Sequence, residues 1–141
     1  MRRAAQRALM PPGQNSEGRD DRAVKRLRIL LVEDEGLIAI MLEDMLEDMG
    51  CEVVKSLAAV APTLAWLEAG GEADAALLDV NLGGEEVFPV AEALSARGVP
   101  FAFTTGYGET HDPRFRTAPL LSKPIKQSRL EAVIRRFAGE G

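Results

Sequence analysis

Three acidic residues and one lysine stand directly after short apolar runs of the sequence. Asp79 follows the letters AALL, Glu33 and Asp34 follow ILLV, and Lys123 follows PLLS. Such runs are typical of strands that are buried on both faces of a parallel sheet. Ligands of open α/β sheets bind at the carboxyl ends of the strands. The pattern therefore predicts a site for a divalent cation and a phosphoryl group at that edge.

The residue types at this edge suit phosphoryl transfer. Neighbouring carboxylates repel one another unless a cation neutralises them, and Mg²⁺ prefers one or two carboxylates, waters and a phosphate oxygen. Asp79 could then attack phosphorus and form an aspartyl phosphate. Lys123 would supply a fixed positive charge, and the Thr105 hydroxyl could bind a phosphoryl oxygen. One acid at a strand end would be weak evidence for a phosphoryl-transfer site. Three acids followed by Lys123 in this chain order are strong evidence for it.

Short apolar runs alternate with helical patterns along most of the chain. This alternation predicts right-handed βαβ units and an α/β fold of the flavodoxin-like type, with a doubly wound, five-stranded parallel sheet and helices on both faces. The sequence predicts strands at 27–32, 52–56, 75–80, 100–104 and 120–123, and helices at about 37–49, 62–69, 88–96 and 128–137. Residues 80–84 are expected to form a loop.

Three finer features follow from local patterns. Ser128 and Glu131 have the spacing of a capping box, which predicts the start of the last helix. The methionines at helical spacing and Trp66 are interpreted as core residues. Residues 106–118 have little helical periodicity, so any helix there should be short or mobile.

Composition limits the class of protein. The chain has 141 residues, of which 46% are hydrophobic and 28% charged, as in an ordinary globular domain. Residues 1–26 carry seven Lys/Arg and three Asp/Glu, whereas residues 27–141 carry ten and nineteen. An acidic body argues against a nucleic-acid partner. We interpret residues 1–26 as a flexible basic tail rather than an arm for an acidic partner or membrane, and residues 27–139 as the domain.

Three observations bear on location. No apolar run approaches the roughly 18 residues that span a membrane, and the N-terminus lacks the apolar stretch of a secretion signal. A single cysteine, Cys51, excludes an intramolecular disulfide. We therefore expect a cytoplasmic protein without a membrane partner.

Four motifs together resemble the receiver domain of two-component response regulators. They are VEDE at 32–35, LLDVNL at 77–82, TTGY at 104–107 and SKP at 122–124, and the resemblance extends from about Leu27 to Phe137. It implies that Asp79 accepts phosphate from a histidine kinase or a histidine phosphotransfer protein.

The resemblance also implies roles for the neighbouring residues. Asp34, Asp79 and the carbonyl of Asn81 would bind Mg²⁺, and Glu33 would contribute through water. Thr105 would be the switch hydroxyl and Lys123 the phosphate-binding lysine.

One position departs from the common pattern of these receivers. They carry Tyr or Phe three residues before the lysine, where this chain has Leu120. The segment FAFTTGY is similar to the motif of the FAT GUY sub-group, which lacks that aromatic and is often a stand-alone domain, although the motif has Ala in place of Thr104. One interpretation is that Tyr107 or the segment 106–118 then takes over signalling. The other, of equal weight, is that Tyr107 is only a partly packed loop residue.

Three functions compete. The first is a phosphorylated signalling switch, a monomer or weak homodimer that catalyses only its own phosphotransfer and dephosphorylation and acts on a downstream protein partner. The second is an aspartyl-phosphate phosphatase of the haloacid dehalogenase type, which needs a second acid where this chain has Asn81. The third is a receiver-like binding module that is never phosphorylated, which the retained acids disfavour.

Overall fold

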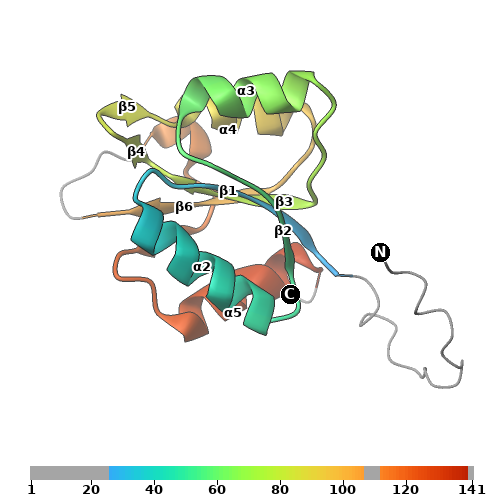
Figure 1. Cartoon of the computed structure of the whole chain (residues 1–141), viewed down its shortest axis with the longest axis vertical. Coiled ribbons are helices and arrows are strands. Elements are labelled where there is room, and N and C mark those ends of the chain that lie inside the picture. The colour runs from blue at the N-terminus through green and yellow to red at the C-terminus, as the bar shows by residue number, and fades with distance from the viewer. Residues whose placement is uncertain (1–25, 107–111, 140–141) are drawn as a thin grey trace, which may run out of the picture.

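The central feature of the computed structural model, which describes residues 26–106 and 112–139, is a five-stranded parallel sheet (Figure 1). The strand order is β2-β1-β3-β6-β7, so β3 is the central strand. In chain order the elements are β1 (Arg28–Val32), α2 (Gly36–Asp48), β2 (Glu52–Leu57), α3 (Val60–Glu68), β3 (Ala75–Asp79), β4 (Asn81–Leu82), β5 (Glu85–Glu86), α4 (Phe88–Ala96), β6 (Phe101–Thr105), the 3₁₀ helix η3 (Pro113–Phe115), β7 (Leu120–Ser122) and α5 (Gln127–Phe137).

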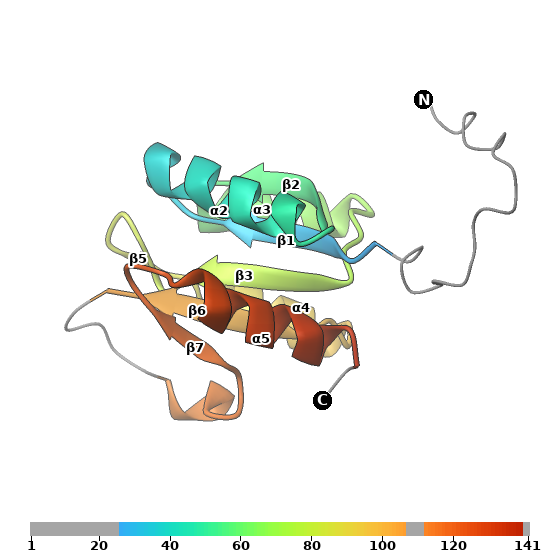
Figure 2. The ribbon, with the colours of Figure 1, turned by 90° about the horizontal axis from the view of Figure 1, so that it is seen from below.

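Helices cover both faces of this sheet. α3 and α4 pack on one face and α2 and α5 on the other, as Figures 1 and 2 show. Alternate residues of each strand enter the two cores: Leu78 and Phe103 pack with α3 and α4, whereas Leu77 and Ala102 pack with α2 and α5. The predicted α/β fold with a doubly wound, flavodoxin-like sheet is therefore confirmed. Among the described residues no helix has the length and apolar character needed to cross a membrane.

The segment after β3 differs from the predicted loop. Residues 81–82 and 85–86 pair as a two-stranded antiparallel hairpin, β4 and β5. Its turn consists of Gly83 and Gly84, whose φ angles are 63° and 94°. Glycine adopts these positive values without steric cost, which explains why consecutive glycines permit so tight a reversal.

The outer face of α2 is more apolar than the sequence pattern predicted. Leu37, Ile40 and Met41 are exposed, with Leu37 83% accessible, so the interpretation of all the methionines as core is wrong for Met41. Met45 and Met49 are half-buried against the core beneath α2, as Trp66 is against the other core. The methionines that recur every four residues lie at the border of the buried face of α2, and Met41, the first of them, lies outside that face.

The capping-box prediction at the last helix is also wrong. α5 begins at Gln127, one residue before Ser128, and its N-cap is Lys126 with no side-chain cap. Ser128 thus lies inside the first turn, because the chain enters the helix directly after Ile125, which is buried in the core. The expectation of a short helix between β6 and β7 agrees with η3, which has three residues.

Candidate functional site

The three predicted acids lie together at the carboxyl edge of the sheet. Asp79 is the last residue of β3, and Glu33 and Asp34 follow the neighbouring strand β1. One carboxylate oxygen from each lies within 4.8 Å of the others. Glu33 and Asp79 are buried and Asp34 is exposed. The cluster is therefore open to solvent on one side, as a site that receives a ligand must be.

Lys123 extends over this cluster from the end of β7. Its Nζ donates a hydrogen bond to Asp79 Oδ2 at 3.0 Å and lies 3.3 Å from Glu33 Oε1. The backbone holds it there, because the Lys123 amide donates to the Thr105 carbonyl at 2.8 Å. Sequence reasoning brought Lys123 to this edge but missed its ion pair with Glu33, since the spacing of residues does not show which acid a flexible side chain reaches.

The acids and the lysine change one another's affinity for protons. Burial raises the pKa of Asp79 to about 7, and the Glu33 carboxylate adds to that rise, while the hydrogen bond from Lys123 opposes it. Burial by itself lowers the pKa of Lys123, but its hydrogen bond to Asp79 and the attraction of both acids outweigh burial and raise it. Lys123 is therefore a permanent positive charge, whereas Asp79 is poised between two protonation states near neutrality.

Asn81 lies where the hairpin turns away from Asp79. Its backbone amide donates to Asp79 Oδ1 at 3.2 Å, and its side-chain oxygen accepts from the Gly84 amide at 2.7 Å. The turn also approaches the acids, because a Cβ placed on Gly83 would lie 3.6 Å from Asp34 Oδ2. The first hydrogen bond ties the hairpin to Asp79 and fixes the direction of the Asn81 backbone, and the second closes the turn of the hairpin.

Thr105 ends β6 on the same edge and is half-buried. Its hydroxyl donates to the Gly106 carbonyl at 3.2 Å. Leu120, the first residue of β7, pairs with Phe103 and is 43% exposed, so much of its side chain is in contact with solvent. Tyr107, for which the sequence left a signalling role and a partly packed loop position equally open, lies outside the described residues, as do residues 108–111 of the segment 106–118.

A second hydroxyl near the site was missed. Thr104 pairs with Asp79 across β3 and β6, its side chain is buried, and its Oγ1 has no hydrogen-bond partner among residues 26–106 and 112–139. The sequence signal was present, since threonine stands where the FAT GUY motif has alanine. A buried hydroxyl without a partner costs free energy, so we expect its removal to stabilise the fold.

Comparisons with known proteins agree with this fold. No family model and no curated protein matches the chain. Among solved structures, SdrG from Sphingomonas melonis Fr1 is 48% identical, with 79% of this chain and 96% of that one covered and a TM-score of 0.71. The signal receiver domain of a modulated diguanylate cyclase from Desulfovibrio desulfuricans G20 is 25% identical (82% and 96% covered, TM-score 0.69). The PhyR response regulator REC domain from Erythrobacter litoralis shares the fold at 24% identity (82% and 92% covered, TM-score 0.68).

Proposed function

Because the chain belongs to the receiver domains of response regulators, which are signalling proteins, we propose that it is a phosphoryl-accepting switch of a two-component system or phosphorelay. In this proposal Asp79 takes the phosphoryl group from a histidine kinase or a histidine phosphotransfer protein. One observation carries it: Asp79 is a buried carboxylate at the tip of the central strand, held by Lys123 and flanked by two further acids.

The proposed reaction is an in-line transfer. An oxygen of Asp79 attacks the phosphorus atom of the donor phosphohistidine, the P–O bond forms, and the P–N bond breaks with the electron pair remaining on the imidazole. Asp79 must be ionised to attack. Lys123 is already within hydrogen-bond distance of Asp79, so it can move to the phosphoryl oxygens and offset their charge with little rearrangement.

The chemistry of the donor set fits Mg²⁺. Asp34, Asp79 and the Asn81 carbonyl would bind it, with Glu33 contributing through water, because oxygen ligands and an open side are what this cation requires. When bound, the cation would neutralise the acids and the transferred group. Thr105, at the end of β6, would act as the switch hydroxyl by donating a hydrogen bond to a phosphoryl oxygen.

The remaining features of the proposal concern the whole chain. Residues 27–139 form the receiver domain and residues 1–26 a basic tail. The protein catalyses only its own phosphotransfer and dephosphorylation, works in the cytoplasm as a monomer or weak homodimer, and passes its signal to a downstream protein partner. The exposed apolar residues of α2, beside the acidic cluster, support a protein as the donor.

Phosphorylation of the purified protein tests the proposal. With acetyl phosphate and Mg²⁺ we expect stoichiometric phosphate that is labile in base, absent in Asp79→Asn and present in the matched control Asp44→Asn, whose carboxylate is exposed on α2. Removal of Mg²⁺ with a chelator should abolish incorporation. Failure to incorporate phosphate from acetyl phosphate and from a histidine kinase would contradict the proposal, and continuous release of phosphate from varied phosphoesters would indicate a phosphatase.

A further inference from the structure

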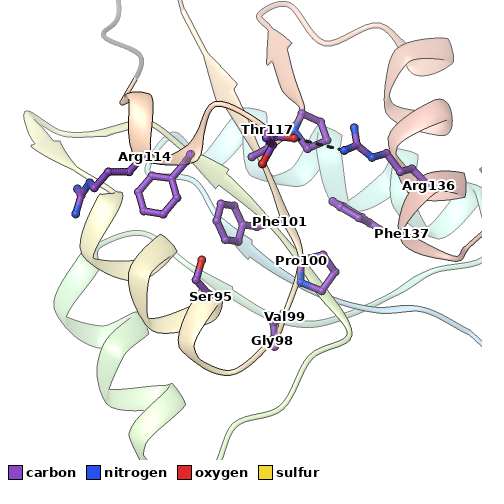
Figure 3. A pocket seen from close by; sticks show the side chains of 12 residues that line it. Ser95, Gly98, Val99, Pro100, Phe101, Arg114, Thr117, Arg136 and Phe137 are labelled. Atoms are coloured by element: carbon purple, nitrogen blue, oxygen red, sulfur yellow. Dashed lines mark hydrogen bonds between the residues drawn. The ribbon is translucent and has the colours of Figure 1, made fainter.

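A second concave site lies at the opposite end of β6 and β7 from Asp79. It is a pocket of about 460 Å³ between the C-terminal ends of α4 and α5 and the helix η3 (Figure 3). Phe101, the first residue of β6, and Pro119, which precedes β7, line it. Because both strands are parallel, Thr105 and Lys123 lie at their other ends. The pocket is thus separate from the acidic cluster.

The floor of this pocket is apolar and largely aromatic. Val99, Phe101, Phe115 and Phe137 all line it. The ring centroids of Phe101 and Phe115 are 5.7 Å apart in an edge-to-face arrangement, and Phe115 also stacks on Phe88 at 6.0 Å. These contacts make the floor part of the packed core, so an apolar side chain from outside would find a preformed surface.

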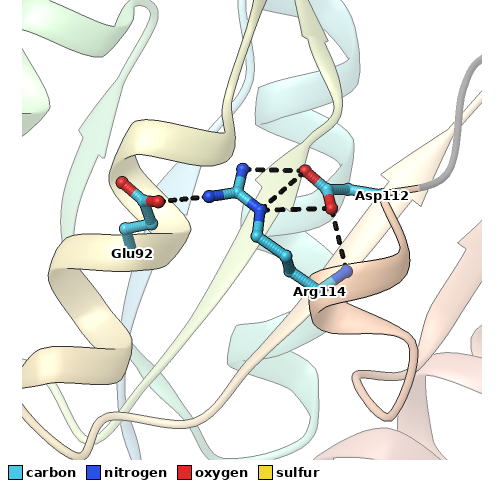
Figure 4. Close-up of polar contacts among 3 residues, drawn as sticks. All are labelled: Glu92, Asp112 and Arg114. Atoms are coloured by element: carbon cyan, nitrogen blue, oxygen red, sulfur yellow. Dashed lines mark hydrogen bonds and ion pairs between the residues drawn. The ribbon is translucent and has the colours of Figure 1, made fainter.

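The wall formed by η3 is held in place by ion pairs. The Arg114 guanidinium binds Asp112 in its own turn and Glu92 on α4, as Figure 4 shows. The same guanidinium lies 5.1 Å from the centre of the Phe115 ring. A single exposed ion pair contributes little, but the stacking of Phe115 on Phe88 accompanies the Arg114–Glu92 pair, so two contacts connect η3 to α4. The wall therefore needs no ordering when a ligand binds, which favours affinity.

Arg136 provides the charge at the rim. Within the described ranges its guanidinium makes one hydrogen bond, to the Thr117 carbonyl at 3.4 Å, as Figure 3 shows. A guanidinium has five N–H donors in a planar fork that matches a carboxylate. Arg114 is already occupied by two acids, so Arg136 is the cation at this pocket that has donors to offer a ligand.

The charge of the surrounding chain has the same sign. Residues 97–138 carry eight Lys/Arg and three Asp/Glu, whereas residues 27–96 carry two and fifteen. The pocket lies among elements of the basic part, because η3, the segment before β7 and α5 supply most of its lining. The described residues that line the pocket include two arginines and no acid, so its local charge favours an anionic ligand.

We propose that this pocket binds an acidic peptide segment of a partner protein. One apolar side chain of the peptide would pack on Phe101 and Phe137, and a neighbouring carboxylate would bind Arg136. A free small molecule fits less well, since Ser95, Pro100 and Thr117 of the lining are exposed and the pocket cannot enclose most of a small ligand. The site goes beyond the proposed phosphorylation, and binding to it does not require Asp79.

Selection from a random peptide library tests this proposal on the unphosphorylated full chain. We expect phage-displayed peptides of about twelve residues, a length that spans such a pocket, to be enriched in one Phe, Leu or Trp flanked by Asp or Glu. Arg136→Glu should weaken binding of the enriched peptide by about tenfold or more, which corresponds to the loss of one charge-assisted contact. Thr117→Trp, which fills the pocket from its exposed rim, should abolish it.

The matched control is the neighbouring Arg135, which is exposed, pairs with Glu131 and does not line the pocket. Arg135→Glu and Asp79→Asn should bind the peptide as the natural chain does, and unchanged thermal midpoints would show that every variant is folded. The proposal is overturned if no peptide is enriched, if the enriched peptides lack acids, or if Arg135→Glu and Arg136→Glu weaken binding equally. Because no phosphate is present, none of these outcomes depends on the proposed switch.

Discussion

Asp79 has an environment that opposes its own ionisation. Burial and the Glu33 carboxylate raise the pKa of Asp79 to about 7, although Lys123 lies 3.0 Å away. A nucleophilic carboxylate must be ionised, so a second positive charge would increase the reactive fraction at neutral pH. This gives the proposed Mg²⁺ two roles: it would neutralise the incoming phosphoryl group, and it would hold Asp79 in the ionised form before transfer.

The metal-free protein should therefore lose stability as Asp79 ionises. Its pKa in the folded chain is above the ordinary value of 3.8, so the stabilising contribution is complete below that value and is lost as pH rises toward about 7. We expect the free energy of unfolding of the natural chain, minus that of Asp79→Asn, to fall over this interval and then to level off. Urea unfolding of both proteins at a series of pH values, in the presence of a chelator, measures this difference. A difference that stays constant with pH would contradict the raised pKa.

Thr104 gives a second prediction at the scale of one residue. Thr104→Val replaces a buried hydroxyl that has no partner in the described part of the chain with a methyl group of similar volume, and should raise the free energy of unfolding by about 1 kcal/mol. Thr63 is the matched control, because it is equally buried but its hydroxyl donates to the Ala59 carbonyl at 2.7 Å. Thr63→Val should lower stability by about 1 kcal/mol. Urea denaturation of both variants decides, and a destabilised Thr104→Val would mean that the Thr104 hydroxyl is bonded in solution.

Among the elements, the buried strands were the most predictable part of the chain. The runs before Glu33 and Asp79 are buried at consecutive positions, which fits strands covered on both faces, whereas the run before Lys123 forms an edge strand in which only Leu121 is buried. The order of alternation predicts a parallel sheet. Since strand ends meet at one edge, the convergence of these three residues followed from the same pattern. The fold and the grouping of the site were therefore accessible from sequence.

The errors arose where tertiary contacts outweigh local preference. Ser128 has the residue type of a helix cap, but the packing of Ile125 starts α5 one residue earlier. Met41 has helical spacing with buried residues, but the width of the core beneath α2 leaves it outside. Spacing also could not reveal the lysine's contact with Glu33 or the pocket beside Arg136, because both depend on where long side chains lie in the folded chain.

The turn between α3 and β3 gives a prediction at the scale of elements. A Cβ on Gly71 would overlap the Trp66 ring, much closer than van der Waals contact allows, and that ring packs against the core. Gly71→Ala should therefore lower the free energy of unfolding by about 1–3 kcal/mol. Gly36→Ala is the control, since no atom lies within 4 Å of a Cβ there, and should leave stability unchanged or slightly higher. Equal effects of the two substitutions in urea would show that Trp66 moves aside freely.

At the scale of the whole molecule, two surfaces of different character lie at different ends of the sheet. Leu37, Ile40 and Met41 expose an apolar face of α2 at the carboxyl edge, next to the acidic cluster. Arg136 and its pocket lie at the amino ends of β6 and β7. A donor that must bring a phosphohistidine to Asp79 has access only from the carboxyl edge. We therefore expect the donor protein and the partner peptide to bind without competing.

Ile40 separates these two surfaces experimentally. Ile40→Glu places a charge on the exposed apolar face of α2 and should slow phosphotransfer from a histidine kinase or histidine phosphotransfer protein by about tenfold, because contacts of this kind contribute about 1–2 kcal/mol to binding. Incorporation from acetyl phosphate, which needs no protein surface, should be unaffected. The Arg136→Ala variant should accept phosphate from the protein donor at the natural rate, because the Arg136 pocket lies at the amino ends of β6 and β7. If Ile40→Glu slowed phosphotransfer from both donors equally, the substitution would have damaged the site itself. If Arg136→Ala slowed phosphotransfer from the protein donor only, the two surfaces would serve one partner.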